Sequence, residues 1–408
     1  MNAPHTSHAP SLLAAVPLAP KDPILGVTES FVADQSPAKV NLGVGVYYDE
    51  NGKVPLLGCV RQVEQQQVQA GAPRPYLPID GLKGYDLAVQ ALIFGTDAPV
   101  LAHKRVVTVQ ALGGTGGLKI GADFLRQLSP RAEVWISDPS WENHRALFEG
   151  TGFKVQAYPY YDPATRGIRF EAMLAALQAL PAGAIVVLHS CCHNPTGVDL
   201  SQDQWRKVLE VVQTRGLVPF LDLAYQGFSE GIDADAYAAR LFGGAMSPVF
   251  LSSSFSKSLS LYGERVGAFS LVAGSADEAV RALSQLKHLV RTNYSNPPTH
   301  GGDIVARVLT TPELRALWEK ELGGMRERIK AMRKALAEGI RQRVPGADWS
   351  FVLNQHGLFS YTGLSKTQVE RLRTEFSIYA IDTGRICVAA LNAKNIDYVC
   401  DAIAKVIR

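Results

Sequence analysis

The chain has 408 residues and a formal net charge of +3, and 47% of its residues are apolar while 19% are charged. These values are typical of a soluble globular protein that is long enough for two domains. The small charge is spread along the chain, so no basic tract favours nucleic acid or an anionic membrane. No apolar run approaches the roughly 18 residues that a membrane-spanning helix needs.

We expect residues 1–17, which are rich in Pro and Ala, to form a flexible tail. The first twenty residues contain no Lys or Arg, which argues against a secretory signal and against an Arg-rich transit peptide. The cysteines have no CxxC spacing, which indicates reduced thiols in the cytoplasm. Cys191, Cys192 and His193 are consecutive and have no second pair of ligands at a useful spacing, so we expect buried thiols and no metal site.

Apolar runs in the middle of the chain predict buried strands. They are nearly continuous rather than alternating, as expected for strands covered on both faces, and amphipathic segments lie between several of them. This alternation predicts an α/β fold with a mostly parallel, doubly wound, seven-stranded sheet in a large domain. The predicted strands are 105–110, 132–138, 153–160, 184–190, 217–225, 248–254 and 266–273.

A long amphipathic pattern begins at Thr311, with a Pro at the first helical position, and stops at Pro345. At 1.5 Å per residue this helix would reach roughly 45 Å, which is long enough to cross a domain boundary. A smaller α+β pattern follows it. We therefore expect an N-terminal arm and part of the small domain over 18–53, a large domain over 54–311, the inter-domain helix over 312–345 and a small C-terminal domain over 346–408.

Polar groups follow several predicted strands, at the edge of an open parallel sheet where ligands bind. Gly114 and Thr115 lie in the Gly-rich turn "ALGGTGGLKIG", which can hold a phosphate at the start of a helix. That turn lacks the ending of an ATP-binding loop, and Lys119 occupies the last Gly position of a dinucleotide fingerprint. On its own the motif is also compatible with a plain tight turn.

Three more strands end beside aromatic, amide or carboxylate groups. Trp141 offers a flat aromatic surface and His144 follows it, while Asn194 precedes a proline that keeps it out of a helix. Asp222 stands at the end of an apolar strand, where burial costs free energy unless the carboxylate is paired or hydrogen-bonded, and Tyr225 follows it. A helix cap or a core salt bridge is the structural alternative for Asp222.

Lys257 stands in the stretch "FLSSSFSKSLSLYGERVGAFS", beside Ser254, Ser256 and Arg265. The serines and the arginine can hold a phosphate, while the lysine amine can form a Schiff base. Pyridoxal phosphate requires both, together with an aromatic surface and an acid at its pyridine nitrogen, for which Asp222 is the candidate. Because separate strand ends supply all of these groups, the sequence predicts a pyridoxal-phosphate site.

Seven motifs along the chain belong together: "NLGVGVYYDENG", "YLPIDG", "HNPTG", "DLAYQGF", "SFSKSLSLYGERVGA", "NYSNPP" and "DTGRICVA". They resemble those of the class I aminotransferases, in the aspartate and aromatic amino-acid subgroup, and most closely the bacterial aromatic enzymes. The match extends from about Asp22 to the C-terminus. It implies the type I fold of pyridoxal-phosphate-dependent transferases and a homodimer with shared active sites, which binds small amino-acid and 2-oxo-acid substrates and neither nucleic acid nor membrane.

The resemblance implies a role for each catalytic candidate. Lys257 would hold the cofactor and carry a proton between the substrate Cα and the cofactor. Asp222, backed by His144, would pair with the pyridine nitrogen. Tyr225 and Asn194 would hydrogen-bond the phenolic oxygen of the cofactor, which lowers the pKa of the Schiff base.

The remaining implied roles concern the phosphate, the ring and the substrate. The phosphate ligands would be Gly114, Thr115, Ser254, Ser256 and Arg265, joined by Tyr76 from a neighbouring subunit. Trp141 would stack on the cofactor ring. The substrate contacts would be Arg385 at the α-carboxylate, Arg291 from the neighbouring subunit at a distal carboxylate, Trp141, Asn194, and Gly45 on a mobile segment.

Substrate preference is mixed at the positions that separate the two branches of the subgroup. Tyr48, Val54 and Pro75 stand where aspartate enzymes typically have Lys, Thr and Asn, which removes polar groups near the substrate side chain. Thr115 and Asn296 match the aspartate pattern instead. We therefore favour a ping-pong transaminase that moves an amino group between an aromatic amino acid (Phe or Tyr, and also Asp) and 2-oxoglutarate. The alternative is an aspartate-selective aminotransferase.

Three other classes are disfavoured. A lyase of the same fold would not need Arg291, since a dicarboxylate site suits glutamate and 2-oxoglutarate. A non-enzymatic regulator would normally add a DNA-binding segment, which the N-terminal tail cannot supply because it carries no Lys or Arg. A nicotinamide-dependent dehydrogenase would need the fingerprint that Lys119 interrupts.

Overall fold

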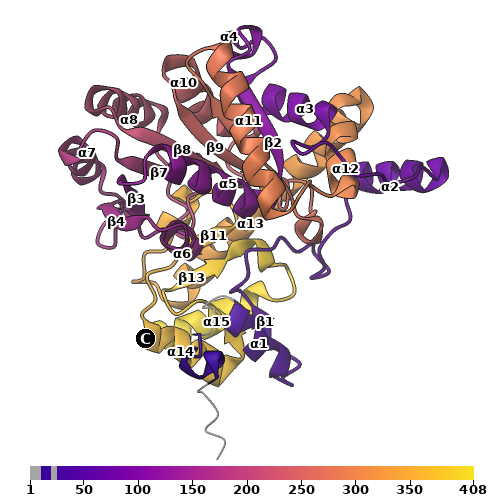
Figure 1. Cartoon of the computed structure of the whole chain (residues 1–408). Coiled ribbons are helices and arrows are strands. Elements are labelled where there is room, and N and C mark those ends of the chain that lie inside the picture. The colour runs from indigo at the N-terminus through magenta and orange to yellow at the C-terminus, as the bar shows by residue number, and fades with distance from the viewer. Residues whose placement is uncertain (1–10, 20–24) are drawn as a thin grey trace, which may run out of the picture.

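The computed structural model describes residues 11–19 and 25–408, and shows a central sheet with flanking helices above a smaller lobe (Figure 1). Residues 1–10 of the predicted tail and 20–24 of the predicted arm lie outside the described residues. The part of the tail that is described contains a short 3-10 turn over Leu12–Ala15. No helix in the described ranges is long and apolar enough to cross a membrane.

The central sheet has seven strands in the order β2-β10-β9-β8-β7-β3-β4. All neighbouring pairs are parallel except those of β10, which runs antiparallel to both β2 and β9. The predicted mostly parallel, seven-stranded sheet is therefore confirmed. The strands are β2 (Val106–Leu112), β3 (Glu133–Asp138), β4 (Lys154–Pro159), β7 (Ile185–His189), β8 (Val218–Leu223), β9 (Val249–Ser254) and β10 (Val266–Val272).

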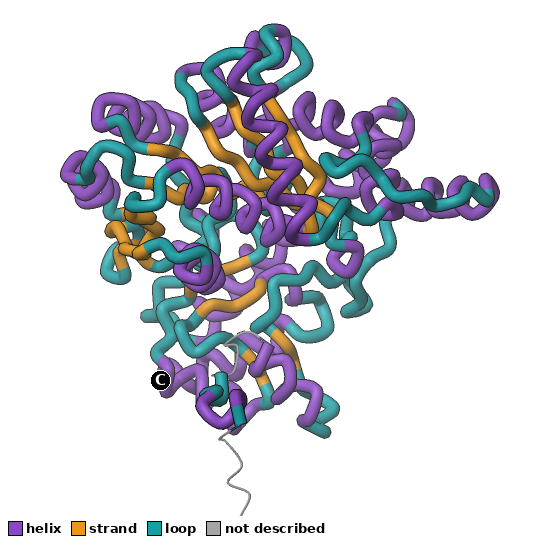
Figure 2. The backbone as a smooth tube through the Cα atoms, in the orientation of Figure 1, coloured by secondary structure: helices purple, strands orange, loops and turns teal. Residues whose placement is uncertain are grey.

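Helices cover both faces of this sheet, and successive strand residues enter two different hydrophobic clusters. In β8, for example, Phe220 packs in the cluster of α5, α6 and α11, while Leu221 packs in the cluster that includes α3, α7, α8, α10 and α12. Both faces need apolar side chains, which explains the continuous apolar runs. Figure 2 shows the strands as a layer between these helices.

The helices up to the end of the sheet region are α1 (Leu25–Ala33), α2 (Gly58–Ala70), α3 (Lys83–Phe94), α4 (Pro99–Ala102), α5 (Gly113–Leu128), α6 (Glu142–Gly150), α7 (Phe170–Ala179), α8 (Gln202–Arg215), α9 (Ile232–Asp235), α10 (Tyr237–Ala245), α11 (Ala276–Asn293) and α12 (Thr299–Thr310). A small hairpin of β5 (Tyr161–Asp162) and β6 (Gly167–Ile168) follows β4. Helix α2 projects from the side of the molecule (Figure 1).

The long helix α13 (Pro312–Arg343) begins with a Pro in its first turn and continues without interruption past the Gly323-Gly324 pair. Near its start, the buried Trp318 donates its indole N–H to the carbonyl oxygen of Ser258 at 2.6 Å. Further along, α13 packs against helix α15 of the smaller lobe. The helix therefore contacts the sheet region at one end and the smaller lobe at the other.

The smaller lobe combines C-terminal elements with a segment from near the N-terminus. Strand β1 (Val40–Asn41) pairs in parallel with β12, and β11 pairs antiparallel with β13. The division into a large domain over 54–311 and a small domain over 346–408, with 18–53 shared, remains our proposal. The C-terminal elements are η3 (Ser350–Asn354), β11 (Phe359–Tyr361), α14 (Lys366–Phe376), β12 (Ile378–Tyr379), β13 (Arg385–Cys387), η4 (Val388–Ala390) and α15 (Ile396–Ile407).

Candidate active site

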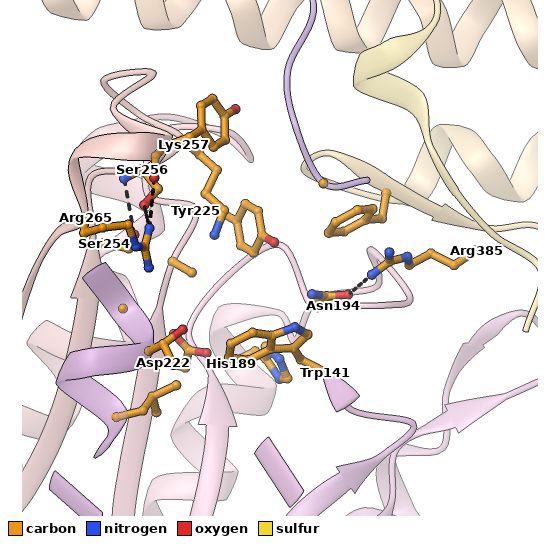
Figure 3. Close-up of a pocket in the computed structure, with 17 residues that line it drawn as sticks. Trp141, His189, Asn194, Asp222, Tyr225, Ser254, Ser256, Lys257, Arg265 and Arg385 are labelled. Carbon is orange, nitrogen blue, oxygen red and sulfur yellow. Dashed lines mark hydrogen bonds between the residues drawn. The ribbon is translucent and has the colours of Figure 1, made fainter. Parts of the chain in front are cut away.

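A cavity of about 260 Å³ lies beyond the carboxyl ends of β7, β8 and β9, where the sheet meets the smaller lobe (Figure 3). This is the edge at which the predicted strand-end residues should gather. The cavity is lined by Gly45, Gly114, Thr115, Leu118, Trp141, His189, Asn194, Asp222, Ala224, Tyr225, Ser254, Ser256, Lys257, Tyr262, Arg265, Phe359 and Arg385.

Lys257 lies in the turn that follows β9, and its Nζ is 4.7 Å from the centroid of the Tyr225 ring. Burial lowers the pKa of this amine to about 8, with Arg265 adding to the effect and Asp222 opposing it. A lysine with this pKa is neutral in a far larger fraction near neutral pH than an exposed lysine. The amine is therefore suited to act as a nucleophile or a base.

Asp222 is the last residue but one of β8, and its Oδ2 lies 2.9 Å from Nε2 of the fully buried His144. The other ring nitrogen of His144 lies 2.9 Å from the Ser140 hydroxyl. Burial raises the pKa of Asp222, but the hydrogen bond and the charge interaction with His144 outweigh it, so the net pKa lies below its ordinary value. The carboxylate thus stays ionised and faces the cavity, while His144 supports it from behind.

An anion-binding corner lies between the start of α5 and the connection that leads from β9 to β10. Arg265 reaches Ser256 Oγ at 3.3 Å and the Tyr262 carbonyl at 3.0 Å. Gly113 has a φ of +68°, a conformation that favours glycine, and a Cβ added there would lie 2.4 Å from the Arg265 guanidinium and displace it. With the N-terminus of α5 beside them, these groups can hold a phosphate.

Four predicted phosphate contacts besides Arg265 line this corner of the cavity: Gly114, Thr115, Ser254 and Ser256. The first two belong to the first turn of α5, and Ser254 ends β9. Figure 3 shows Ser254, Ser256 and Arg265 clustered beside Lys257. The corner therefore combines hydroxyl donors, a helix start and one guanidinium around the reactive amine.

Arg385 occupies the opposite side of the cavity and is only 1% exposed. Its guanidinium donates to Asn194 Oδ1 at 3.1 Å and to the Gly43 carbonyl at 2.7 Å, and its Nε has no partner among the described residues. None of the described carboxylates forms an ion pair with it. A buried guanidinium in this state is ready to bind the carboxylate of a ligand.

Aromatic rings enclose the space between these two sides. Trp141 lines the cavity at the start of α6, and the Tyr225 ring meets the Phe359 ring edge-on at 6.0 Å. Burial raises the pKa of the Tyr225 hydroxyl, which therefore remains a hydrogen-bond donor. A Cβ added to Gly45 would lie 2.5 Å from the Phe359 ring, so only a glycine lets this segment approach so closely.

Two predicted site residues lie outside the cavity of this single chain. Tyr76 is 91% exposed. Arg291, near the end of α11, is exposed and donates a hydrogen bond to the Ser295 hydroxyl. Both were predicted to act on a neighbouring subunit's site, and that assignment stays a prediction.

Sequence reasoning missed five lining residues: Leu118, His189, Ala224, Tyr262 and Phe359. His189 ends β7 opposite Asp222, and neither of its ring nitrogens has a hydrogen-bond partner in the described part of the chain. The strand-end rule that found Asp222 would have found His189 as well. Phe359 comes from the smaller lobe, where no local signal points to the cavity.

Two clusters of ligand-type atoms, each within 4.8 Å, occur in the described residues: one of His144, His189 and Asp222, and one of Cys191, Cys192 and Asp235. All five cysteines are buried and unpaired. Asp222 is already hydrogen-bonded to His144, and Asp235 accepts three backbone N–H groups. The expectation that the protein uses no metal remains a prediction.

Comparisons with known proteins agree on one group. The family model for class I and II aminotransferases matches residues 37–403. The aspartate aminotransferase of Pseudomonas aeruginosa is 59% identical over 397 residues, 97% of this chain and 100% of the relative. The aromatic-amino-acid aminotransferase of Escherichia coli is 51% identical over 386 residues, 94% of this chain and 97% of the relative.

A solved structure agrees with these sequence matches. An aromatic-amino-acid aminotransferase from Burkholderia pseudomallei, covalently bound to pyridoxal phosphate, superposes with a TM-score of 0.96 at 64% identity. The superposition covers 98% of this chain and 100% of that chain. The similarity therefore extends over both lobes and the cavity between them.

Proposed function

The chain belongs to the class I and II aminotransferase family, and from that premise we propose that it exchanges amino groups between aromatic amino acids and 2-oxoglutarate. The proposed donors are Phe and Tyr, with Asp also accepted, in a ping-pong reaction that uses pyridoxal phosphate. One observation carries the proposal. A buried lysine of lowered pKa, an ionised Asp222, an anion-binding corner and the unpaired Arg385 all face one cavity.

The residues of the cavity fit pyridoxal phosphate. The hydroxyl groups of Thr115, Ser254 and Ser256 line the corner beside Arg265. Among the described residues, Ser254 and Ser256 only accept hydrogen bonds there, from the Ser256 N–H and from Arg265, so both hydroxyl groups can still donate to a phosphate. Lys257 would hold the cofactor, Asp222 would pair with its ring nitrogen, and Trp141 would cover its ring. When bound, the cofactor supplies an electron sink for the pair released at the substrate Cα.

The chain's own groups perform the remaining work. The amine of Lys257 can take the proton from the substrate Cα and pass it to the cofactor, because burial lowers its pKa and so makes it a usable base near neutral pH. Tyr225 and Asn194 can donate hydrogen bonds to the cofactor's phenolic oxygen. Asp222 stays ionised throughout, because His144 stabilises its charge.

Arg385 would bind the substrate α-carboxylate, and the Phe359 ring beside it would exclude water. Arg291 of a second subunit would contact the distal carboxylate of the substrate side chain. Tyr48, Val54 and Pro75 would supply apolar contact to that side chain. Val54 is 44% exposed in the single chain, which leaves it free for a second subunit to cover. An aspartate-selective enzyme is the second candidate, since the Pseudomonas aeruginosa relative bears that name.

We propose a homodimer with shared active sites for the same reason. Residues 54–76 present apolar and aromatic side chains to solvent, among them Leu56 at 59% and Val68 at 79% exposure. Tyr76 lies at the end of this stretch, and α2 within it projects from the molecule (Figure 1). A cytoplasmic location fits five buried, unpaired thiols, which persist in a reducing compartment.

Half-reactions test the proposal. The protein loaded with pyridoxal phosphate is mixed separately with phenylalanine, tyrosine, aspartate and glutamate, and the loss of the cofactor's visible absorbance is followed. We expect all four to convert the cofactor to its amine form. Conversion by aspartate and glutamate alone would favour the aspartate-selective candidate, and release of free ammonia would indicate a lyase.

A further inference from the structure

Arg333 on α13 is a charged side chain that the proposed chemistry does not use. It is 3% exposed, and although the charge of Asp199 favours its ionised form, no described carboxylate lies within ion-pair distance of it. Burial lowers its pKa to about 10, so it still carries a charge near neutral pH. Burying a charge without a direct counter-ion costs free energy unless hydrogen bonds satisfy the charge. The partners of Arg333 therefore indicate what the buried arginine does.

All the hydrogen bonds of Arg333 go to one segment of the smaller lobe. Its guanidinium donates to the carbonyl oxygens of Val352 at 3.3 Å, Gly357 at 2.8 Å and Phe359 at 2.6 Å, and to the Ser360 hydroxyl at 2.5 Å. Hydrogen bonds from an ionised donor are stronger than neutral ones. One side chain therefore fixes the backbone before and at Phe359, together with the Ser360 side chain that follows it.

Phe359 is the point at which this segment enters the cavity. Its ring centroid lies 4.3 Å from the Arg385 guanidinium, and the ring closes against Gly45. The same segment also meets the turn that carries Asn194, because His356 N–H donates to the Gly197 carbonyl at 2.6 Å. Arg333 itself does not line the cavity. It contacts, from outside the cavity, the segment that forms the cavity wall beside Arg385.

We propose that Arg333 is a positioning residue for substrate recognition, which acts through Phe359 on the Arg385 side of the cavity. The inference rests on the proposed transaminase function. The anion-binding corner, by contrast, stands on the sheet and on α5, and Arg333 makes no hydrogen bond to either. Loss of the guanidinium should therefore weaken substrate binding far more than cofactor binding, which depends mainly on Lys257 and the anion-binding corner.

The test compares Arg333→Lys with Arg341→Lys, an exposed arginine on the same helix. Lysine keeps the charge but cannot bridge the separated carbonyl groups. Binding of 3-phenylpropionate, which has a carboxylate and no amine, is measured by calorimetry on the cofactor-loaded protein. Since misplacement of about 1 Å can cost up to a hundredfold, we expect Arg333→Lys to raise this Kd and the KM for phenylalanine at least about tenfold.

The control readouts separate positioning from folding. Arg341→Lys should leave Kd and KM unchanged, and Arg333→Lys should bind pyridoxal phosphate within about threefold of the parent protein. Equal losses of cofactor and substrate affinity, or a lowered melting temperature with Kd unchanged, would overturn the inference. If Arg333→Lys does not fold, Ser360→Ala removes one acceptor and should shift Kd in the same direction.

A double-mutant cycle tests the route through Phe359. In Phe359→Leu the ring is already lost, so adding Arg333→Lys should change Kd by less than about threefold. Fully additive effects would show that Arg333 does not act through Phe359. A parent protein that binds pyridoxal phosphate and 3-phenylpropionate but fails to transaminate would instead contradict the proposed function, and the binding comparison would still stand.

Discussion

The two sides of the cavity are built in different ways. The cofactor side consists of consecutive strand ends and the start of α5, so its groups are fixed by one sheet and by short links such as that between His144 and Asp222. The substrate side is assembled from Gly45, Asn194, Phe359 and Arg385, which lie far apart in the chain. It is held by hydrogen bonds between separate segments of the chain, including those that Arg333 donates from α13.

This difference separates chemistry from selectivity. A change on the cofactor side removes a group that every substrate needs, so all activities should fall together. A change on the substrate side moves a wall or removes one recognition group, so activities toward different amino acids should change unequally. The predictions below test that contrast, beginning with the cofactor side.

Lys257→Ala should have the largest effect, because it removes both the cofactor attachment and the proton carrier. We expect kcat to fall at least about a thousandfold for phenylalanine and aspartate alike. Lys119→Ala, on the exposed surface of α5, is the control and should retain activity. Borohydride reduction of the loaded protein followed by peptide mapping should label Lys257, and a label on Lys119 or Lys287 would refute the assignment.

Arg291→Leu should separate the substrates. Loss of a charged, bidentate contact to the distal carboxylate should lower kcat/KM for aspartate and glutamate at least about a hundredfold. Activity toward phenylalanine should change less than about tenfold, because an aromatic ring does not use the guanidinium. Arg281→Leu, another exposed arginine of α11, is the matched control. Equal losses for both kinds of substrate would make Arg291 structural.

Mixed dimers should show which side of the cavity is shared between subunits. Lys257→Ala mixed with Arg291→Ala should regain part of the activity, since a hybrid dimer contains one complete site. Lys257→Ala mixed with Arg385→Ala should regain none, because both residues serve the same subunit's cavity. The measurement is transaminase activity with aspartate and 2-oxoglutarate, the substrates that need Arg291, after subunit exchange has been verified by mass spectrometry. No recovery in the first mixture would contradict the shared site.

The smallest effect concerns the titration of Lys257 in the cofactor-free protein. Amine labelling as a function of pH should give a pKa of about 8, and Asp222→Asn should lower it, because the carboxylate raises it. The folded-state pKa lies below the ordinary value of 10.5, so the unfolded chain binds more protons between these two values. This group alone should therefore make the folded state more stable as pH rises from about 8 to 10.5, and an unshifted pKa would contradict the burial of the amine.

Sequence patterns predicted the residues of the cofactor side because they lie at or beyond the end of a strand that its own apolar run identifies. Asp222, Lys257 and the turn at Gly114 are examples, and His189 obeys the same rule although it was overlooked. The antiparallel direction of β10 could not be predicted, since an apolar run has no direction. Phe359 and Arg333 were also beyond prediction, because their importance arises from contacts across the lobes. Arg291 and Tyr76 rest on the resemblance alone.

Helix α13 fixes the distance and rotation between its contact with the cofactor side of the cavity and its contact with the substrate side. Trp318 contacts the carbonyl next to Lys257, and Arg333 holds the segment of Phe359, with continuous helix between them. One residue inserted between these positions would turn Arg333 by about 100° relative to Trp318 and move it 1.5 Å along the axis. The helix could then keep the contact of Trp318 or those of Arg333, but not both. Insertions and deletions that surface loops absorb should therefore be excluded between residues 318 and 333, even though many of the positions between them face solvent.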